Sequence, residues 1–202
     1  MQQPNFYHTI ELPSVAEYKD RGSKFLGFAF PIETVGQFKE RLKVLKEEHI
    51  KAAHHCFAYR IGLDKNNFRT ADDREPAGTA GKVILGQIDS RALCNVGIVV
   101  VRYFGGTLLG VPALANAYKT VSSLALQLTP IIQKPVLVIY QLSFDYTLMN
   151  EVMMIVKRSG CTVMESKTLL FCNMSVALPR STEEECLQQF RTLHGLEITL
   201  VT

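Results

Sequence analysis

The residues whose types and spacing could do chemistry are concentrated in one polar stretch, residues 71–82. Three carboxylates, Asp72, Asp73 and Glu75, lie within four positions, and a glycine-rich run follows them. That run consists of Gly78, Thr79, Ala80, Gly81 and Lys82. Clustered carboxylates can hold Mg²⁺ or divide acid and base roles, whereas glycines admit a ligand to the backbone and a lysine suits phosphate. Local ion pairing in a solvated loop, and a helix start that needs small residues, are the plainer interpretations that stay open.

A second glycine-rich loop follows the most apolar stretch of the chain. Its residues of interest are Arg102, Tyr103, Gly105, Gly106 and Gly110. The spacing of Gly105 and Gly110 is that of a P-loop, but Val111 and Pro112 stand where a P-loop needs lysine and then serine or threonine. We therefore exclude nucleotide hydrolysis by this motif. A looser contact with phosphate or with an RNA backbone stays open, as does a purely conformational role of the glycines.

The run His54-His55-Cys56 is a third candidate. Neighbours on a strand point to opposite faces, so His54 and Cys56 share a face while His55 points away from them. We expect His55 to line the same cleft as the acidic stretch. Cys56 is expected to be a small buried thiol rather than a nucleophile, and the chain offers no second spaced pair of Cys or His for a zinc site.

Composition and charge narrow the class of protein. The 202 residues are 47% hydrophobic and 20% charged, which is typical of an ordinary globular protein. The net charge of +3 is compatible with RNA or ribosome contact without demanding it. Five cysteines without a C-x-x-C pair indicate free thiols in a reducing compartment. With no signal peptide and no apolar run that could span a membrane, we expect a cytoplasmic protein.

The elements that position these residues follow from periodicity and turn signals. The predicted strands of the first half cover residues 8–18, 22–32, 54–62 and 95–103, and its predicted helices begin at Thr34, Lys82 and Pro112. Gln37 completes a capping box with Thr34, and the strand 95–103 is apolar on both faces, which predicts a central place in its sheet. Residues 64–81 are predicted to be a long loop.

The dipeptides Thr129-Pro130 and Lys134-Pro135 mark a domain boundary, so we expect domains 1–131 and 132–202. The second half reads as strand 136–146, helix 148–159, a hairpin of 161–167 with 168–178, a helix capped by Ser181 with Glu184, and strand 196–201. We also expect Gly160 and Gly195 to end the two helices. The order βαββαβ is that of a ferredoxin-like domain.

Three separated motifs resemble the signature of the YigZ/Impact family: residues 54–58, residues 72–81, and residues 99–106 with 108–110. The resemblance implies an α+β chain, with an N-terminal domain like ribosomal protein S5 domain 2 followed by the ferredoxin-like domain of bacterial YigZ-type members. Eukaryotic Impact members regulate translation by competing for a co-activator of the general-control kinase. The family has no established catalytic residues, so the motif residues are carried over only as a binding surface.

Two departures from the family pattern concern the loops. Arg74 stands where the family usually has glycine, and Val111-Pro112-Ala113 replaces a small, glycine-rich turn. Both reduce backbone freedom, and Pro112 lacks an N–H donor. These departures argue against direct phosphate cradling by the second loop.

The leading hypothesis is a non-enzymatic, translation-associated regulatory module without a cofactor or metal. It would bind RNA, the ribosome or a translation protein on one concave, cation-lined face that both glycine-rich loops form. The residues expected on that face are His55, Asp72, Asp73, Glu75, Gly78, Thr79, Gly81, Lys82, Arg102, Tyr103, Gly105, Gly106 and Gly110. Arg60, Lys119 and Phe104 could add charge and stacking for single-stranded nucleic acid.

Two alternatives stay open. The first is a Mg²⁺-dependent enzyme that acts on a phosphorylated small molecule or nucleotide, with the three carboxylates of residues 72–75 holding the metal and His55 assisting. The second is a protein-interaction scaffold that uses the exposed strands of the ferredoxin-like half. A small-molecule ligand is compatible with either.

Overall fold

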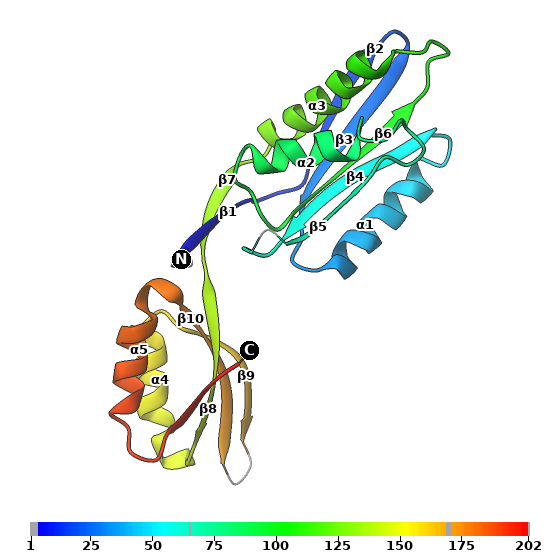
Figure 1. Ribbon diagram of the computed structural model, residues 1–202. Coiled ribbons are helices and arrows are strands. Elements are labelled where there is room, and N and C mark those ends of the chain that lie inside the picture. Colours follow the sequence, from blue (N-terminus) through cyan, green and yellow to red (C-terminus); the bar gives the residue numbers. More distant parts are fainter. Residues whose placement is uncertain (1–3, 65, 169–170, 202) are drawn as a thin grey trace. The chain divides into compact units, whose positions relative to one another are not determined.

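The computed structural model describes residues 4–64, 66–168 and 171–201. The chain divides into two compact units, each with its own sheet and helices (Figure 1). The first unit is Tyr7–Gln133, and the second holds the remainder of the described residues. No helix in the described part of the chain has the length and apolar character needed to cross a membrane.

The first unit is built on a five-stranded antiparallel sheet with the strand order β2-β3-β6-β4-β5. The strands are β2 (Ser14–Asp20), β3 (Ser23–Pro31), β4 (His54–Ile61), β5 (Asn67–Ala71) and β6 (Val96–Tyr103). Every residue of β6 from Val96 to Arg102 is buried. Its central place, predicted from two apolar faces, is therefore confirmed.

Helices cover both faces of this sheet. Helices α2 (Gly81–Asp89) and α3 (Val111–Gln127) pack on one face, and α1 (Val35–Glu48) packs on the other (Figure 1). Because strand side chains alternate, Val100 lies in the core under α2 and α3, whereas Val99 and Val101 lie in the core under α1.

The first turn of α1 forms as its sequence predicts. The hydroxyl of Thr34 accepts a hydrogen bond from the Gln37 amide at 3.2 Å, and the Gln37 side chain accepts one from the Thr34 amide at 3.4 Å. This reciprocal capping box satisfies two donors that a helix start otherwise leaves unpaired.

Three short strands were missed. The predicted strand 8–18 is two strands, because Pro13 between β1 (Phe6–Ile10) and β2 cannot donate to a ladder. Likewise β7 (Ile131–Pro135) precedes β8 (Leu137–Phe144), and β1 pairs with β7 in a two-stranded sheet. The predicted loop 64–81 contains β5, whose pattern is mostly exposed because it forms the edge of the sheet.

The second unit has the predicted order βαββαβ. Its antiparallel sheet has the order β11-β8-β10-β9, with β9 (Thr162–Thr168), β10 (Cys172–Pro179) and β11 (Glu197–Leu200). The helices α4 (Met149–Arg158) and α5 (Glu183–Arg191) share one core with the sheet. Short 3-10 turns, η1 (Tyr146–Leu148) and η2 (Arg180–Thr182), precede the helices.

Local expectations in this unit had mixed outcomes. The capping box of Ser181 with Glu184 is wrong: Ser181 lies inside η2, and α5 has Thr182 as its N-cap without a side-chain hydrogen bond. Gly160 directly follows the α4 C-cap with φ 66°, as expected of a glycine at that position. The α5 helix ends at Arg191, four residues before Gly195. Leu169 and Leu170, which belong to the predicted strand 168–178, lie outside the described residues.

Gly97 of β6 has no side chain, and the rings of Phe38 and Phe30 pack where a Cβ would lie. Gly97→Ala is therefore expected to lower the free energy of unfolding by about 1–3 kcal/mol. An added Cβ would lie 2.8 Å from the Phe38 ring and 2.9 Å from the Phe30 ring. Urea denaturation of the full chain measures the change. The matched control is Gly86→Ala in α2, where a Cβ meets no described atom within 4 Å and alanine favours the helix. Unchanged stability of Gly97→Ala would contradict this packing.

Candidate functional site

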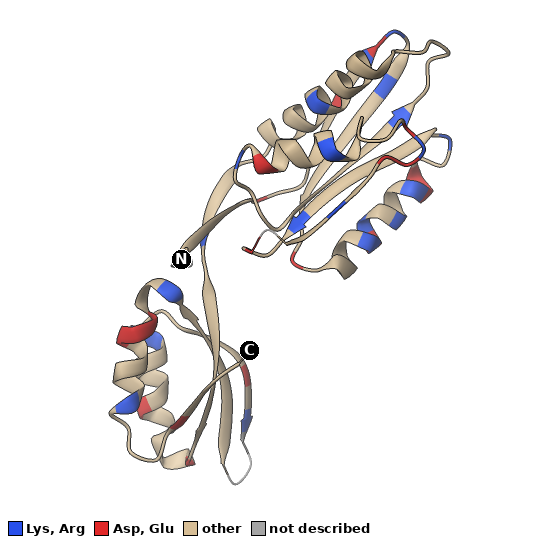
Figure 2. Cartoon of the chain, in the orientation of Figure 1, with Lys and Arg blue, Asp and Glu red and all other residues tan. Residues whose placement is uncertain are grey.

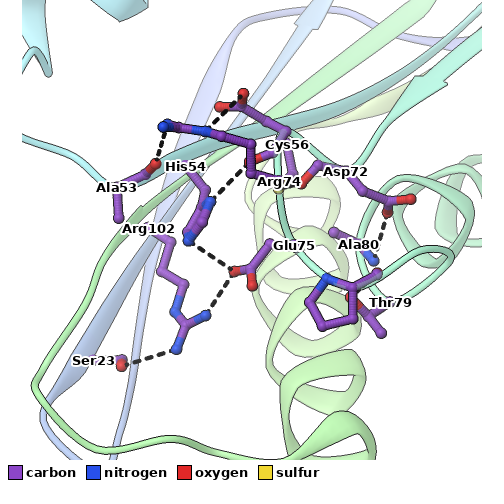
Figure 3. Close-up of polar contacts among 12 residues, drawn as sticks. Ser23, Ala53, His54, Cys56, Asp72, Arg74, Glu75, Thr79, Ala80 and Arg102 are labelled. Atoms are coloured by element: carbon purple, nitrogen blue, oxygen red, sulfur yellow. Dashed lines mark hydrogen bonds and ion pairs between the residues drawn. The ribbon is translucent and has the colours of Figure 1, made fainter.

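A buried carboxylate joins the two glycine-rich segments. Glu75 Oε1 accepts hydrogen bonds from Arg102 Nη1 at 2.6 Å and from the Tyr118 hydroxyl at 2.8 Å. His54 Nε2 lies 3.8 Å from the same oxygen. Figure 3 shows the side chains of His54 and Arg102 directed toward Glu75. The acidic stretch after β5 is thus attached to the end of β6 and to α3.

Arg102 is enclosed on every side that the structure describes. Its side chain is 5% exposed and that of Glu75 is 4% exposed. A second guanidinium nitrogen donates to Ser23 Oγ at 3.4 Å, and the guanidinium carbon lies 5.3 Å from the Phe25 ring centroid and 5.5 Å from that of Phe104. We expected Arg102 to offer its charge to a ligand. That expectation is wrong, because the charge is buried and neutralised by Glu75.

The first glycine-rich loop is closed by Asp72. Its carboxylate accepts hydrogen bonds from the amides of Gly78 at 2.8 Å, Ala80 at 3.0 Å and Gly81 at 2.7 Å. Burial by itself raises the pKa of Asp72, but these amides and Lys82 outweigh burial and hold the pKa below its usual value. The amides that were expected to bind a ligand phosphate therefore already donate their hydrogen bonds to Asp72, at the start of α2.

The small residues of this loop serve its conformation. A Cβ on Gly81 would lie 2.8 Å from the Ala71 nitrogen, so the backbones approach too closely for any side chain. Thr79 is buried and donates its hydroxyl to the Pro76 carbonyl at 2.7 Å. Gly78 has φ 78°, a conformation that favours glycine. Lys82 is exposed on α2.

Asp73 and Arg74 form the left-handed turn that leads into Glu75. Their φ angles are 40° and 69°, and Arg74 Nη2 donates to the Ala53 carbonyl at 2.8 Å. Asp73 Oδ2 accepts from the His55 amide at 2.7 Å. The positive φ of Arg74 is a conformation that favours glycine, which is the residue that the family resemblance implies at this position.

The three carboxylates therefore bind three different sets of donors: Asp72 binds loop amides, Asp73 binds β4, and Glu75 binds Arg102 and Tyr118. Among the described residues, no group of three Asp, Glu, His or Cys side chains could hold a metal ion. The Mg²⁺ site of the enzyme hypothesis is thus not assembled by these residues.

The alternation along β4 holds, but the assignment of the histidines is corrected. His54 is the histidine that faces Glu75, and its Nδ1 lies 2.8 Å from the Asp73 carbonyl. The His55 ring faces the α1 side, where Lys46 and His49 act on it. Burial lowers the pKa of His55 against an opposing effect of Asp73. The His55 ring still lies beside the acidic stretch, because its Nδ1 is 4.0 Å from Asp73 Oδ2, whereas His54 is the histidine beside Glu75.

Cys56 is a buried thiol, as predicted. Its Sγ donates to the Asp72 carbonyl at 3.0 Å and lies 3.2 Å from the Tyr118 hydroxyl. Burial raises the pKa of Cys56 to about 12, with Tyr118 opposing. The thiolate needed for nucleophilic attack is therefore scarce near neutral pH.

The second glycine-rich loop is anchored at Gly105. Its amide donates to Ser23 Oγ at 3.2 Å, and a Cβ there would lie 2.0 Å from the Gly22 carbonyl carbon. The turn between β2 and β3 and the loop after β6 thus touch backbone to backbone. Gly106 and Gly110 have φ of 85° and 78° and face open space, which is a conformational role.

This loop carries several exposed apolar side chains, although Leu109 within it is buried in the core. Phe104, Leu108 and Val111 are all exposed, and the chain has no charged residue from Tyr103 to Tyr118. Figure 2 shows this directly: the loop between β6 and α3 is tan throughout. The expected cation-lined surface is therefore absent from this loop. Tyr103 points to the α1 side instead, where its hydroxyl lies 2.9 Å from His49 Nδ1.

In the polar cluster of Glu75, Arg102, His54, Tyr118 and Ser23, sequence reasoning missed Ser23 and Tyr118. His54 was a candidate, but not as a neighbour of Glu75. Tyr118 lies on the buried face of α3, and its side chain is fully buried. The only available signal was its hydroxyl, because a buried Tyr usually finds a hydrogen-bond partner.

Residues 21–126, which contain both loops and the polar cluster, match the model of the Impact N-terminal domain. The chain belongs to the Impact family. IMPACT family member YigZ of Escherichia coli is 32% identical over 159 residues, which cover 78% of each chain. Protein IMPACT of Rattus norvegicus is 34% identical over 106 residues, which cover 50% of this chain and 33% of that protein.

A crystal structure described as that of a hypothetical protein covers 98% of each chain at 27% identity, with a TM-score of 0.81. The α+β two-domain fold predicted for an Impact-family member of the YigZ type is thereby confirmed, and so is the family predicted from the three motifs.

Because Glu75 compensates a buried guanidinium, Glu75→Gln is expected to lower the free energy of unfolding by about 3 kcal/mol. The matched control is Glu17→Gln. Glu17 lies 2.7 Å from Lys24, but the two side chains are 42% and 40% exposed, so solvent screens the pair and stability should hardly change. Urea denaturation compares the two variants, and equal losses would show that the buried pair has no special weight.

The His55 pKa gives a pH-dependent prediction. A pKa lowered by folding means that the unfolded chain binds the proton more tightly, so stability should fall as pH drops below about 6.5. His55→Gln should lose less stability than the natural chain between about pH 8 and about pH 5.5. His8→Gln, at an exposed site, should retain the natural slope. Identical slopes for all three chains, measured by urea denaturation at each pH, would refute the assignment.

Proposed function

We propose that this Impact-family chain is a non-catalytic module that binds a protein of the translation machinery through its apolar loop, residues 104–111. The observation that carries the proposal is the contrast between the two halves of the site. Asp72 and Glu75 are bound by donors inside the chain, whereas the loop that follows Arg102 presents the apolar side chains of Phe104, Leu108 and Val111 to solvent.

The internal contacts argue against catalysis by the candidate residues. A nucleophile or general base needs a free or activated group. Asp72 is held by three amides, Glu75 by Arg102 and Tyr118, and Cys56 has a raised pKa. No observation on the described residues favours the Mg²⁺-dependent enzyme.

The character of the loop favours a protein over RNA. Binding to a nucleic-acid backbone depends on cations that neutralise phosphates, and this loop contributes none. Protein interfaces instead have an apolar centre that excludes water. Leu108, which is 84% exposed, and the neighbouring Phe104 and Val111 supply such a centre.

The link to translation rests on the family. The family resemblance implies that eukaryotic Impact members regulate translation, and residues 21–126 of this chain match the Impact N-terminal domain. Protein IMPACT of Rattus norvegicus aligns over half of this chain. We therefore propose a partner within the translation machinery, and the apolar loop as the surface that contacts it.

We expect Leu108→Ser to weaken this binding at least tenfold without changing the thermal unfolding midpoint, because it removes apolar contact and touches no internal bond. The matched control is Ile50→Ser, at a residue 81% exposed beyond the end of α1, which should bind like the natural chain. A photo-crosslinker at position 108, used in a bacterial translation extract, identifies the partner, and titration with that purified partner gives the affinities.

RNase treatment decides the chemical class. Crosslinks to a translation protein that survive RNase support the proposal. Crosslinks to RNA, crosslinks only to proteins outside translation, or equal effects of Leu108→Ser and Ile50→Ser would each overturn it.

A further inference from the structure

Two cysteine thiols lie next to each other in the second unit. Cys161 Sγ is 3.8 Å from Cys186 Sγ, although the residues are 25 positions apart in sequence. Cys161 lies in the short connection between α4 and β9, and Cys186 lies on α5. Neither residue belongs to the Impact N-terminal match or to the proposed binding loop.

Their surroundings keep both sulfurs pointed at the end of α4. Each Sγ lies 4.0 Å from the Ser159 carbonyl oxygen, and Cys186 Sγ is also 3.9 Å from Thr182 Oγ1. The two thiols thus share one acceptor and face each other across it. Cys186 is held on α5, and Cys161 follows the C-cap of α4 by two residues.

We propose that Cys161 and Cys186 form a reversible intramolecular disulfide when the chain is exposed to a hydroperoxide. Cys161 is half-buried and reacts first, whereas Cys186 is 1% exposed and acts as the resolving thiol. The juxtaposition of one accessible and one buried thiol carries the assignment.

The chemistry balances in two steps. The Cys161 sulfur attacks one oxygen of hydrogen peroxide, the O–O bond breaks, and a sulfenic acid and one water form. The Cys186 sulfur then attacks the Cys161 sulfur, its thiol proton leaves with the departing hydroxide as a second water, and the S–S bond forms. Two thiols are oxidised, and the peroxide is reduced to two waters.

The geometry leaves a short distance to close. An S–S bond is about 2.05 Å long, so one sulfur must move toward the other. Cys161 is the one that can move, because it follows Gly160 at φ 66° and lies outside the regular ladder of β9. Cys186, in the buried face of α5, is fixed by its helix.

The reaction of Cys161 with hydrogen peroxide is expected to be slow near neutral pH. Burial raises the pKa of Cys161 to about 12, and the neighbouring Cys186 adds to the rise, so little thiolate is present. The pair therefore responds to sustained oxidant rather than to brief exposure. Once formed, the disulfide would link residues 25 positions apart and reduce the conformational entropy of the unfolded chain.

The test uses the full chain, treated with hydrogen peroxide, quenched by alkylation under denaturing conditions and mapped by peptide mass spectrometry. We expect a Cys161–Cys186 linked peptide, a fall from five titratable thiols to three in the unfolded chain, and full recovery with dithiothreitol. The thermal midpoint of the second unit should rise by roughly 5 °C or more on oxidation.

Two variants separate pairing from general thiol oxidation. Cys161→Ser should abolish the linked peptide and the rise in midpoint. Cys172→Ala, a matched control at a buried thiol of β10 in the same core, should retain both. If Cys172→Ala does not fold, mapping of the natural chain decides alone. Sulfinic or sulfonic acid on Cys161 with Cys186 still reduced, or a disulfide between other cysteines, would overturn the proposal.

Discussion

Glu75 and Arg102 are 27 residues apart in sequence and meet at 2.6 Å under α3, with almost no exposed surface. Removing one partner from a buried pair leaves an uncompensated charge, which is far more costly than losing an exposed pair. Tyr118 donates a hydrogen bond to Glu75, and Ser23 accepts one from Arg102. Strand β3, strand β6, helix α3 and the acidic stretch therefore all meet at this pair. The positions of both glycine-rich segments depend on it.

This constraint also bears on the proposed function. Groups that could have served a ligand are used inside the molecule: Asp72 holds the start of α2, and Glu75 holds the end of β6. Arg102 in turn lies beneath the Phe104 ring, where the chain leaves the sheet and enters a loop without charge. A base of internal polar contacts therefore supports an apolar surface. That combination is suited to recognition of another protein, because a preformed surface loses little entropy on binding.

Local signals in the sequence predicted local structure well. The Thr34 and Gln37 pair, the apolar β6 and the order of the second unit all follow from residues close in sequence. The errors arose at residues whose burial and contacts depend on a partner that is distant in sequence. Arg102 looked like a surface cation because nothing near it in sequence shows that Glu75 will neutralise it. Similarly, the alternation along β4 gave the opposite faces of His54 and His55 but not that His54 would lie beside Glu75. The polar β5 carries no apolar pattern that would mark it as a strand.

The most direct test of the central role of the Glu75–Arg102 pair is amide hydrogen exchange, followed by mass spectrometry, in the natural chain and the Glu75→Gln variant. Residues 72–81 and 100–105 should exchange faster in the variant, while β10 in the second unit should keep its natural rates, because only the first unit contains the pair. Unchanged exchange in both segments of the variant would contradict the central role of this pair.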